Sequence, residues 1–119
     1  MNTYDDNNIF AKILRGEIPC EAVYEDDYVL AFKDIAPQAP VHVLVIPKGA
    51  YISIEDFGAN GSAAEVHGFY AALSTITSQL SLSENGFRVI ANTGAHGGQE
   101  VPHYHVHILG GEPVGPMRG

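Results

Sequence analysis

Hydrophobic positions recur at two spacings along the chain, and each spacing predicts a different kind of element. After Ser62 they recur every three or four positions, a pattern typical of an amphipathic helix. Ser62 and Glu65 have the S-x-x-E spacing of a capping box, which predicts that the helix begins just after Ser62. The hydrophobic positions of this helix are Val66, Phe69, Tyr70, Leu73, Ile76 and Leu80.

A shorter helix is predicted near the N-terminus. Apolar residues recur at helical spacing from Ile9 to Leu14, behind the polar residues Asp6 and Asn7. Gly16 and a proline three positions later end the pattern, because glycine favours the C-terminal end of a helix and proline cannot continue one. The sequence therefore predicts two helices.

Runs of β-forming residues predict about five strands. The runs are residues 22–25, 28–34, 41–46, 87–91 and 103–109. Asp26 and Asp27 separate the first two runs and predict a hairpin, and residues 92–99 form a glycine-rich loop. Because the strands follow one another without strict βαβ alternation, we expect an α+β fold with a mostly antiparallel sheet.

The length and the charge of the chain exclude several classes of function. The 119 residues predict a single domain spanning 1–119. With 14 acidic and 6 basic residues the net charge is −8, which argues against a nucleic-acid polymer or an anionic membrane as partner. A small anionic ligand is still compatible, since it needs only a local positive potential. Cys20 is the only cysteine, so neither an internal disulfide nor a thiolate-rich zinc site can form.

The polar N-terminal segment lacks the features of a targeting signal, and no apolar run approaches the ~20 residues that span a bilayer. We therefore expect a cytoplasmic protein.

Three histidines fall within five residues. His103, His105 and His107 alternate with apolar or aromatic residues, so in a strand they share one face, which is exposed or lines a cleft. Three interpretations compete: a merely polar outer face, a metal site, and a catalytic site. Neighbouring histidines would lie ~6.6 Å apart and the outer pair ~13 Å apart, so a metal would need a further ligand such as His42 or Glu100.

We favour catalysis. Imidazole can act as a nucleophile and as a general acid near neutrality, because its ordinary pKa is ~6.5. Gly97 and Gly98 lie just before the histidines, and glycines let backbone N–H groups approach an anion closely. A zinc ion is the less favoured alternative, and no cofactor is required.

Residues 98–111 resemble the signature of the histidine triad (HIT) superfamily, His-x-His-x-His with apolar x residues. The similarity extends to residues 8–13, 17–19, 32–42 and 45–48, which resemble the Hint branch, the histidine triad nucleotide-binding proteins. It covers nearly the whole chain except the 53–61 loop and the tail. It implies a HIT-like fold and a homodimer joined through the long helix and a strand.

The resemblance also implies a purine nucleoside phosphoramidase. His105 would attack the α-phosphorus and expel an amine, and water would then release a nucleoside monophosphate such as AMP. His107 would contact the phosphate and help protonate the leaving group. His103 and His42 would orient and polarise the nucleophile through hydrogen bonds, although His42 also fits a buried structural histidine.

Nucleotide-binding roles follow from the same resemblance. Asp34 would hold the ribose. The apolar slot for the base would be formed by Ile9, Phe10, Ile13, Phe32 and Ile35, all of which also fit a purely structural role. The phosphate would be surrounded by Asn92, Gly98, Gln99 and Glu100.

Glu100 stands where some Hint proteins carry serine, and an ionised carboxylate cannot donate to phosphate, so we expect a backbone contact there. Two alternative functions are a dinucleoside polyphosphate hydrolase resembling the fragile histidine triad branch, and a purine-nucleotide-binding regulator with incidental hydrolysis.

Overall fold

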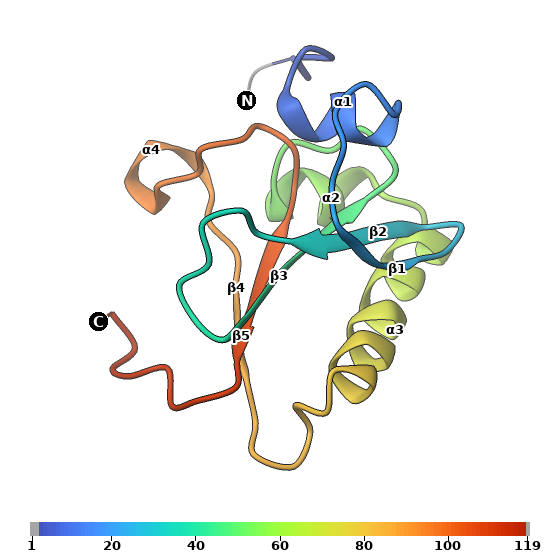
Figure 1. Ribbon diagram of the computed structural model, residues 1–119. Helices are drawn as coiled ribbons and strands as arrows, with labels where there is room; N and C mark the ends of the chain where they lie inside the picture. Colours follow the sequence, from blue (N-terminus) through green and yellow to red (C-terminus); the bar gives the residue numbers. More distant parts are fainter. Residues whose placement is uncertain (1–2, 119) are drawn as a thin grey trace.

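A five-stranded sheet with the strand order β1-β2-β3-β5-β4 forms the centre of the protein (Figure 1). The computed structural model describes residues 3–118. Every neighbouring pair of strands is antiparallel, so the predicted antiparallel α+β sheet is confirmed. The strands are β1 (Ala22–Glu25), β2 (Val29–Lys33), β3 (Val41–Pro47), β4 (Arg88–Ile90) and β5 (Val106–Gly110).

The two predicted helices are present, and their ends follow from local hydrogen bonds. In α1 (Ile9–Leu14) the side chain of Asn8 accepts from the N–H of Ala11. In α3 (Ala63–Gln79) both hydrogen bonds of the capping box are present, which confirms the predicted start. No helix within residues 3–118 has both the length and the apolar character to cross a bilayer.

The predicted number of helices was too low, because residues 3–118 contain four. α2 (Ile54–Asn60) lies where no helix was predicted, and Ser53 caps it by accepting from Asp56. α4 (Gly94–Gly97) is a single turn inside the predicted glycine-rich loop. α2 buries only Phe57 and α4 buries no residue, so neither shows a recurring apolar face, and glycine is a poor helix former.

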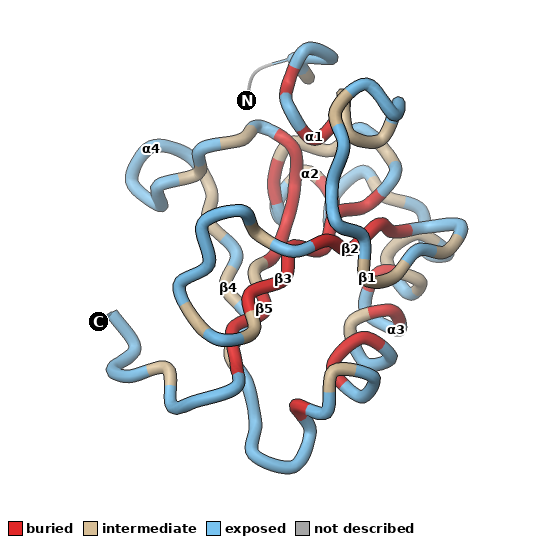
Figure 2. The backbone as a smooth tube through the Cα atoms, viewed as in Figure 1, coloured by how far each residue is buried: buried red, intermediate tan, exposed pale blue. Residues whose placement is uncertain are grey.

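The two faces of the sheet carry different cores. The larger core lies on the α3 face, defined by Val29, Ala31, Val43, Val45, Val106 and Ile108, which pack against Phe57 of α2 and Phe69, Ala72 and Ile76 of α3. The smaller core lies on the α1 face, where Leu30, Phe32, Leu44 and Ile46 pack against Phe10. In Figure 2 the buried residues gather along β2, β3 and β5, at the centre of the sheet.

The final strand begins later than the histidine pattern predicts. β5 starts at Val106, so His107 is the only triad residue in the strand, and residues 101–103 form a bend. Pro102 has no N–H to donate to a ladder, and the N–H of Tyr104 donates to the carbonyl of Tyr51 instead of to β3. The prediction that all three histidines lie on one strand was therefore wrong.

Candidate active site

The histidines meet on the α1 face, where β3 and β5 lie side by side. His42 and Leu44 share this face of β3, and His107 is the register partner of Leu44 on β5. A cavity of about 350 Å³ opens here. It is lined by Phe10, Asp34, Ala36, Gln38, Leu44, Asn92, Gly98, Glu100, Val101, His105 and His107.

The tautomer of His105 follows from its hydrogen bond to the main chain. Nδ1 lies 2.7 Å from the carbonyl oxygen of His103. A carbonyl can only accept, so Nδ1 carries the proton and Nε2 keeps its lone pair. Burial lowers the pKa of His105, which favours the neutral ring. His105 therefore offers an unprotonated nitrogen at the wall of the cavity.

His42 and His107 form a second hydrogen-bonded unit. The N–H of Gln38 donates to Nδ1 of His42 at 3.0 Å, so the proton of a neutral His42 lies on Nε2. That Nε2 lies 3.0 Å from Nδ1 of His107 and 3.4 Å from Oδ2 of Asp34. Nε2 of His107 must then carry the ring proton of the neutral form. Burial, followed by the charges of His105 and His42, lowers the pKa of His107 to about 4.

His103 is fully buried and is not among the residues that line the cavity. Its Nε2 lies 2.8 Å from the carbonyl of Pro47, and its Nδ1 lies 2.6 Å from the hydroxyl of Tyr4. Burial lowers its pKa to about 4. His103 orients His105 through its main-chain carbonyl, while its ring is held elsewhere. Nor does His42 contact the expected nucleophile; its partner is His107.

The residues expected around the phosphate are brought together only in part. Asn92, Gly98 and Glu100 line the cavity, whereas Gln99 is not among its lining residues. The side-chain amide of Gln99 donates to the carbonyls of Ile52 and Val101, and its oxygen accepts from the N–H of Gly94. Gln99 thus holds the loop that carries the lining residues.

The residues expected to form an apolar slot for the base agree least with the lining of the cavity. Of its five residues, only Phe10 lines the cavity. Phe32 belongs to the small core, with Ile13 packed against it, whereas Ile9 is 44% and Ile35 99% exposed. The structure does not bring these four to the cavity, so their contact with a base stays a prediction.

Sequence reasoning missed Ala36, Gln38, Leu44 and Val101 in the lining. Leu44 could have been found, because it lies two positions after His42 in a strand and so shares its face. Gln38 acts on His42 through its backbone N–H, and its residue type carries no signal for that contact.

One group of side chains could hold a cation. The ligand atoms of Asp34, His42 and His107 all lie within 4.8 Å of one another. A metal bound between the rings would have to replace the hydrogen bond between His42 and His107. Glu100 is not part of this group, although the metal hypothesis named it as a candidate ligand.

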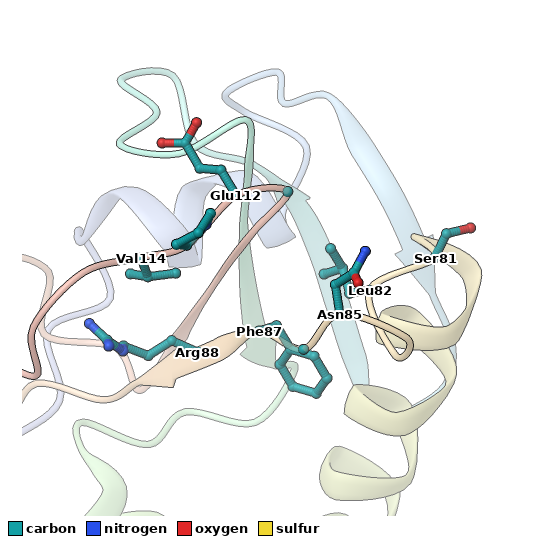
Figure 3. Close-up of a pocket in the computed structure, with 10 residues that line it drawn as sticks. Ser81, Leu82, Asn85, Phe87, Arg88, Glu112 and Val114 are labelled. Carbon is teal, nitrogen blue, oxygen red and sulfur yellow. The ribbon is translucent and has the colours of Figure 1, made fainter.

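A larger cavity, of about 650 Å³, lies between the segment 81–88 and the C-terminal tail (Figure 3). Its described lining contains no histidine. The guanidinium of Arg88 donates to the carbonyls of Gly115 and Pro116, so it is already engaged in holding the tail. The smaller cavity is therefore the candidate active site, because its lining carries His105, with an unprotonated ring nitrogen, and His107, with a ring N–H.

Comparison with known proteins agrees with this site. The model of the HIT domain matches residues 15–114. The purine nucleoside phosphoramidase of Escherichia coli K12 is 46% identical over 112 residues, 94% of this chain and 93% of that protein. The structure of a histidine triad protein from Clostridium difficile has a TM-score of 0.83 at 44% identity, covering 95% of this chain and 96% of that one. A HIT family hydrolase from Legionella pneumophila has a TM-score of 0.87 at 40% identity, covering 95% and 100%.

The arrangement is that of a histidine-based site for attack on an electrophile, built on an α+β sheet. The chain belongs to the HIT domain family, so the resemblance found in the sequence is confirmed.

Proposed function

We propose that the protein is a hydrolase that cleaves the P–N bond of purine nucleoside phosphoramidates. The observation that carries the proposal is the fixed tautomer of His105, whose Nδ1–H is held by the carbonyl of His103. This leaves Nε2 free to attack phosphorus at the wall of the cavity. The identity to the E. coli relative, which is named purine nucleoside phosphoramidase, supports the choice of substrate.

In the first step Nε2 of His105 forms a bond to the α-phosphorus, and the P–N bond to the amine breaks. The departing amine takes the Nε2 proton of His107 while the Nε2 proton of His42 moves to Nδ1 of His107, so the pair of rings is one proton short until the second step returns it. His105 gains positive charge as its new bond forms. The ring centres of His105 and His107 are 5.1 Å apart, so this charge develops beside the group that loses a proton.

In the second step water attacks phosphorus and breaks the bond to His105. The proton released by water returns to the pair of His107 and His42, so the two steps leave both rings as they began. The products are an amine and a nucleoside monophosphate.

In the proposed function, Asp34 accepts hydrogen bonds from the ribose hydroxyls. It lines the cavity, and its Oδ1 accepts from the N–H of Ala36 at 2.8 Å, which holds the carboxylate in place. A carboxylate oxygen can accept more than one hydrogen bond, so this contact leaves room for a ribose hydroxyl.

The test is turnover of an adenosine phosphoramidate by wild type, His105→Ala and His96→Ala. His96 is an exposed histidine on α4, which makes it a matched control. We expect His105→Ala to lose at least about 10³-fold in kcat, while His96→Ala stays at the wild-type value. Equal turnover by His105→Ala and wild type would overturn the nucleophile assignment.

The same assay separates the alternatives. Activity that is lost with a chelator and restored by zinc would favour the metal hypothesis. Faster cleavage of a dinucleoside polyphosphate would favour the second class of hydrolase. Binding of purine monophosphates without turnover of either substrate would favour a nucleotide-binding regulator.

A further inference from the structure

The buried ring of His103 is held at both of its nitrogens. The carbonyl of Pro47 can only accept, so Nε2 of His103, 2.8 Å away, must carry the proton. Nδ1 is then an acceptor, and the hydroxyl of Tyr4 donates to it across 2.6 Å. Burial raises the pKa of Tyr4, so the hydroxyl keeps the proton that it donates.

This contact joins the N-terminal segment to the nucleophile. The same residue that receives the hydrogen bond of Tyr4 presents its carbonyl to Nδ1 of His105. The ring of Phe10 also packs edge-on against both histidines, with ring centres 6.4 Å from His103 and 5.0 Å from His105. A movement of the His103 ring would therefore disturb both supports of His105.

Other hydrogen bonds hold the segment that carries Tyr4. Arg15, which follows α1, donates from Nη1 to the carbonyl of Asp6 at 2.9 Å, and Nδ2 of Asn8 donates to the carbonyl of Asp5 at 2.8 Å. The segment lies before residue 15, where the match to the family model begins. Tyr4 thus lies outside the region matched by the family model, whereas its partner His103 lies within it.

We propose that Tyr4 is a positioning residue for the reaction. Its hydroxyl holds the ring of His103 in one tautomer and one rotation, and so fixes the carbonyl that orients His105. The proposal rests on the proposed function, because it assigns Tyr4 an effect on the attack by His105. Without the hydroxyl, Nδ1 of His103 would be a buried acceptor with no partner, and the ring would turn or change tautomer to find one.

The test compares wild type, Tyr4→Phe and Tyr24→Phe. Tyr4→Phe keeps the ring, whose centre lies 5.6 Å from that of His103 at an angle of 69°, and removes only the hydroxyl. Tyr24→Phe is the matched control, since it removes a hydroxyl that donates to Asp26 at 2.8 Å on β1, away from the residues that line the active-site cavity.

We expect kcat of Tyr4→Phe to fall about tenfold with KM nearly unchanged, a smaller loss than the ~10²-fold that a 1 Å misplacement costs. Ring ¹⁵N chemical shifts should show a single tautomer of His103 in wild type and in Tyr24→Phe, and a mixture in Tyr4→Phe. Thermal midpoints of all three proteins separate this effect from unfolding.

An unchanged His103 spectrum together with an unchanged kcat would overturn the proposal. So would a lower thermal midpoint with wild-type kcat per folded molecule, because that result means a structural contact only. If wild type cleaves no phosphoramidate, the proposed function fails, and the ¹⁵N spectra still decide whether Tyr4 fixes the ring of His103.

Discussion

The two faces of the sheet use the same strands for opposite purposes. On β5, Val106 and Ile108 point to the α3 face and are almost completely buried among apolar side chains. His107, between them, points to the α1 face and lines the cavity. The strand period of two thus places packing and chemistry on alternate residues of one rigid element.

The difference shows how polar groups can be kept in a small interior. Burying an imidazole is costly unless its nitrogens are hydrogen-bonded. On the α1 face the three most buried rings each have a main-chain partner, which is Gln38 for His42, Pro47 for His103 and His103 for His105. Because these partners are backbone groups, the fold itself sets the tautomers that the proposed reaction needs.

The largest expected effect is a loss of kcat from a substitution on the α1 face that leaves the packing of the α3 face intact. His107→Asn removes the proposed proton donor, so kcat should fall about 10²–10⁴-fold, the usual contribution of general acid–base catalysis. Stability should change little, because Nε2 of His42 keeps Asp34 as a neighbour at 3.4 Å. Steady-state kinetics and urea unfolding measure the two effects. His67→Asn, at an exposed position of α3, is the control; if it matched His107→Asn in kcat, the assignment would be wrong.

The second prediction concerns a substitution in the core on the α3 face, which should lower stability and leave kcat unchanged. Phe69 is fully buried, with its ring centre 5.3 Å from that of Phe57 and 5.2 Å from that of Tyr104. Phe69→Ala should lower the free energy of unfolding by about 3–5 kcal/mol, with kcat per folded molecule unchanged. Urea denaturation gives the first value and turnover at low temperature the second.

Tyr70→Phe is the control for that measurement, since it removes only a hydroxyl 3.3 Å from that of Tyr104. A loss below about 1 kcal/mol in Phe69→Ala would show that the α3 face can rearrange around the missing ring.

The third prediction concerns the pH dependence of the free energy of unfolding, which the buried histidines of the α1 face should cause and the apolar α3 face should not. Burial lowers the pKa of His103 to about 4 in the folded protein, whereas an unfolded chain holds histidine near ~6.5. The unfolded state therefore binds the proton more readily. The contribution of His103 to the free energy of unfolding should be fully present above about pH 6.5. It should be lost as the pH drops towards 4, which lowers the free energy of unfolding by about 3 kcal/mol.

Urea unfolding at several values between pH 7 and pH 5 measures the slope before most carboxylates titrate. The exposed variant His67→Asn should have the same slope as wild type. A flat profile between pH 6.5 and pH 5 would contradict the burial argument for the α1 face.

The smallest expected effect concerns the side-chain cap at the start of α3. Ser62→Ala removes the side chain that accepts from the N–H of Glu65 at 3.0 Å, so unfolding should become easier by about 1 kcal/mol. Ser83→Ala, at an exposed position outside the helices, should have no comparable effect. Thermal denaturation can resolve the pair, and equal midpoints would mean that packing alone holds the start of α3.

Much of the fold could be predicted because its signals are local. The capping box of Ser62 and Glu65 and the hairpin turn at Asp26 act over a few residues, and both are confirmed. α2 could not be predicted, because a helix of seven residues with one buried side chain, Phe57, shows no period.

For the candidate site, the sequence could predict which types of residue take part but not how these residues contact one another. Alternation identified the triad, but the amide of Tyr104 pairs with Tyr51 from a distant segment, and this helps to delay the start of β5 until Val106. The contact of Tyr4 with His103 joins residues 99 positions apart, which no local pattern reveals. Ile35 fits an apolar slot by type, yet it stands almost fully exposed in its loop.

The lining of the active-site cavity has a consequence for how a ligand arrives. Within the described lining there are two carboxylates, Asp34 and Glu100, and neither lysine nor arginine, in a chain of net charge −8. A negatively charged nucleotide therefore diffuses towards the protein against its field. Salt screens such a field, so encounter should become faster as ionic strength rises, the reverse of the behaviour of basic nucleic-acid binders. In the proposed function, capture of the nucleotide therefore depends on short-range contacts made after encounter and not on long-range attraction.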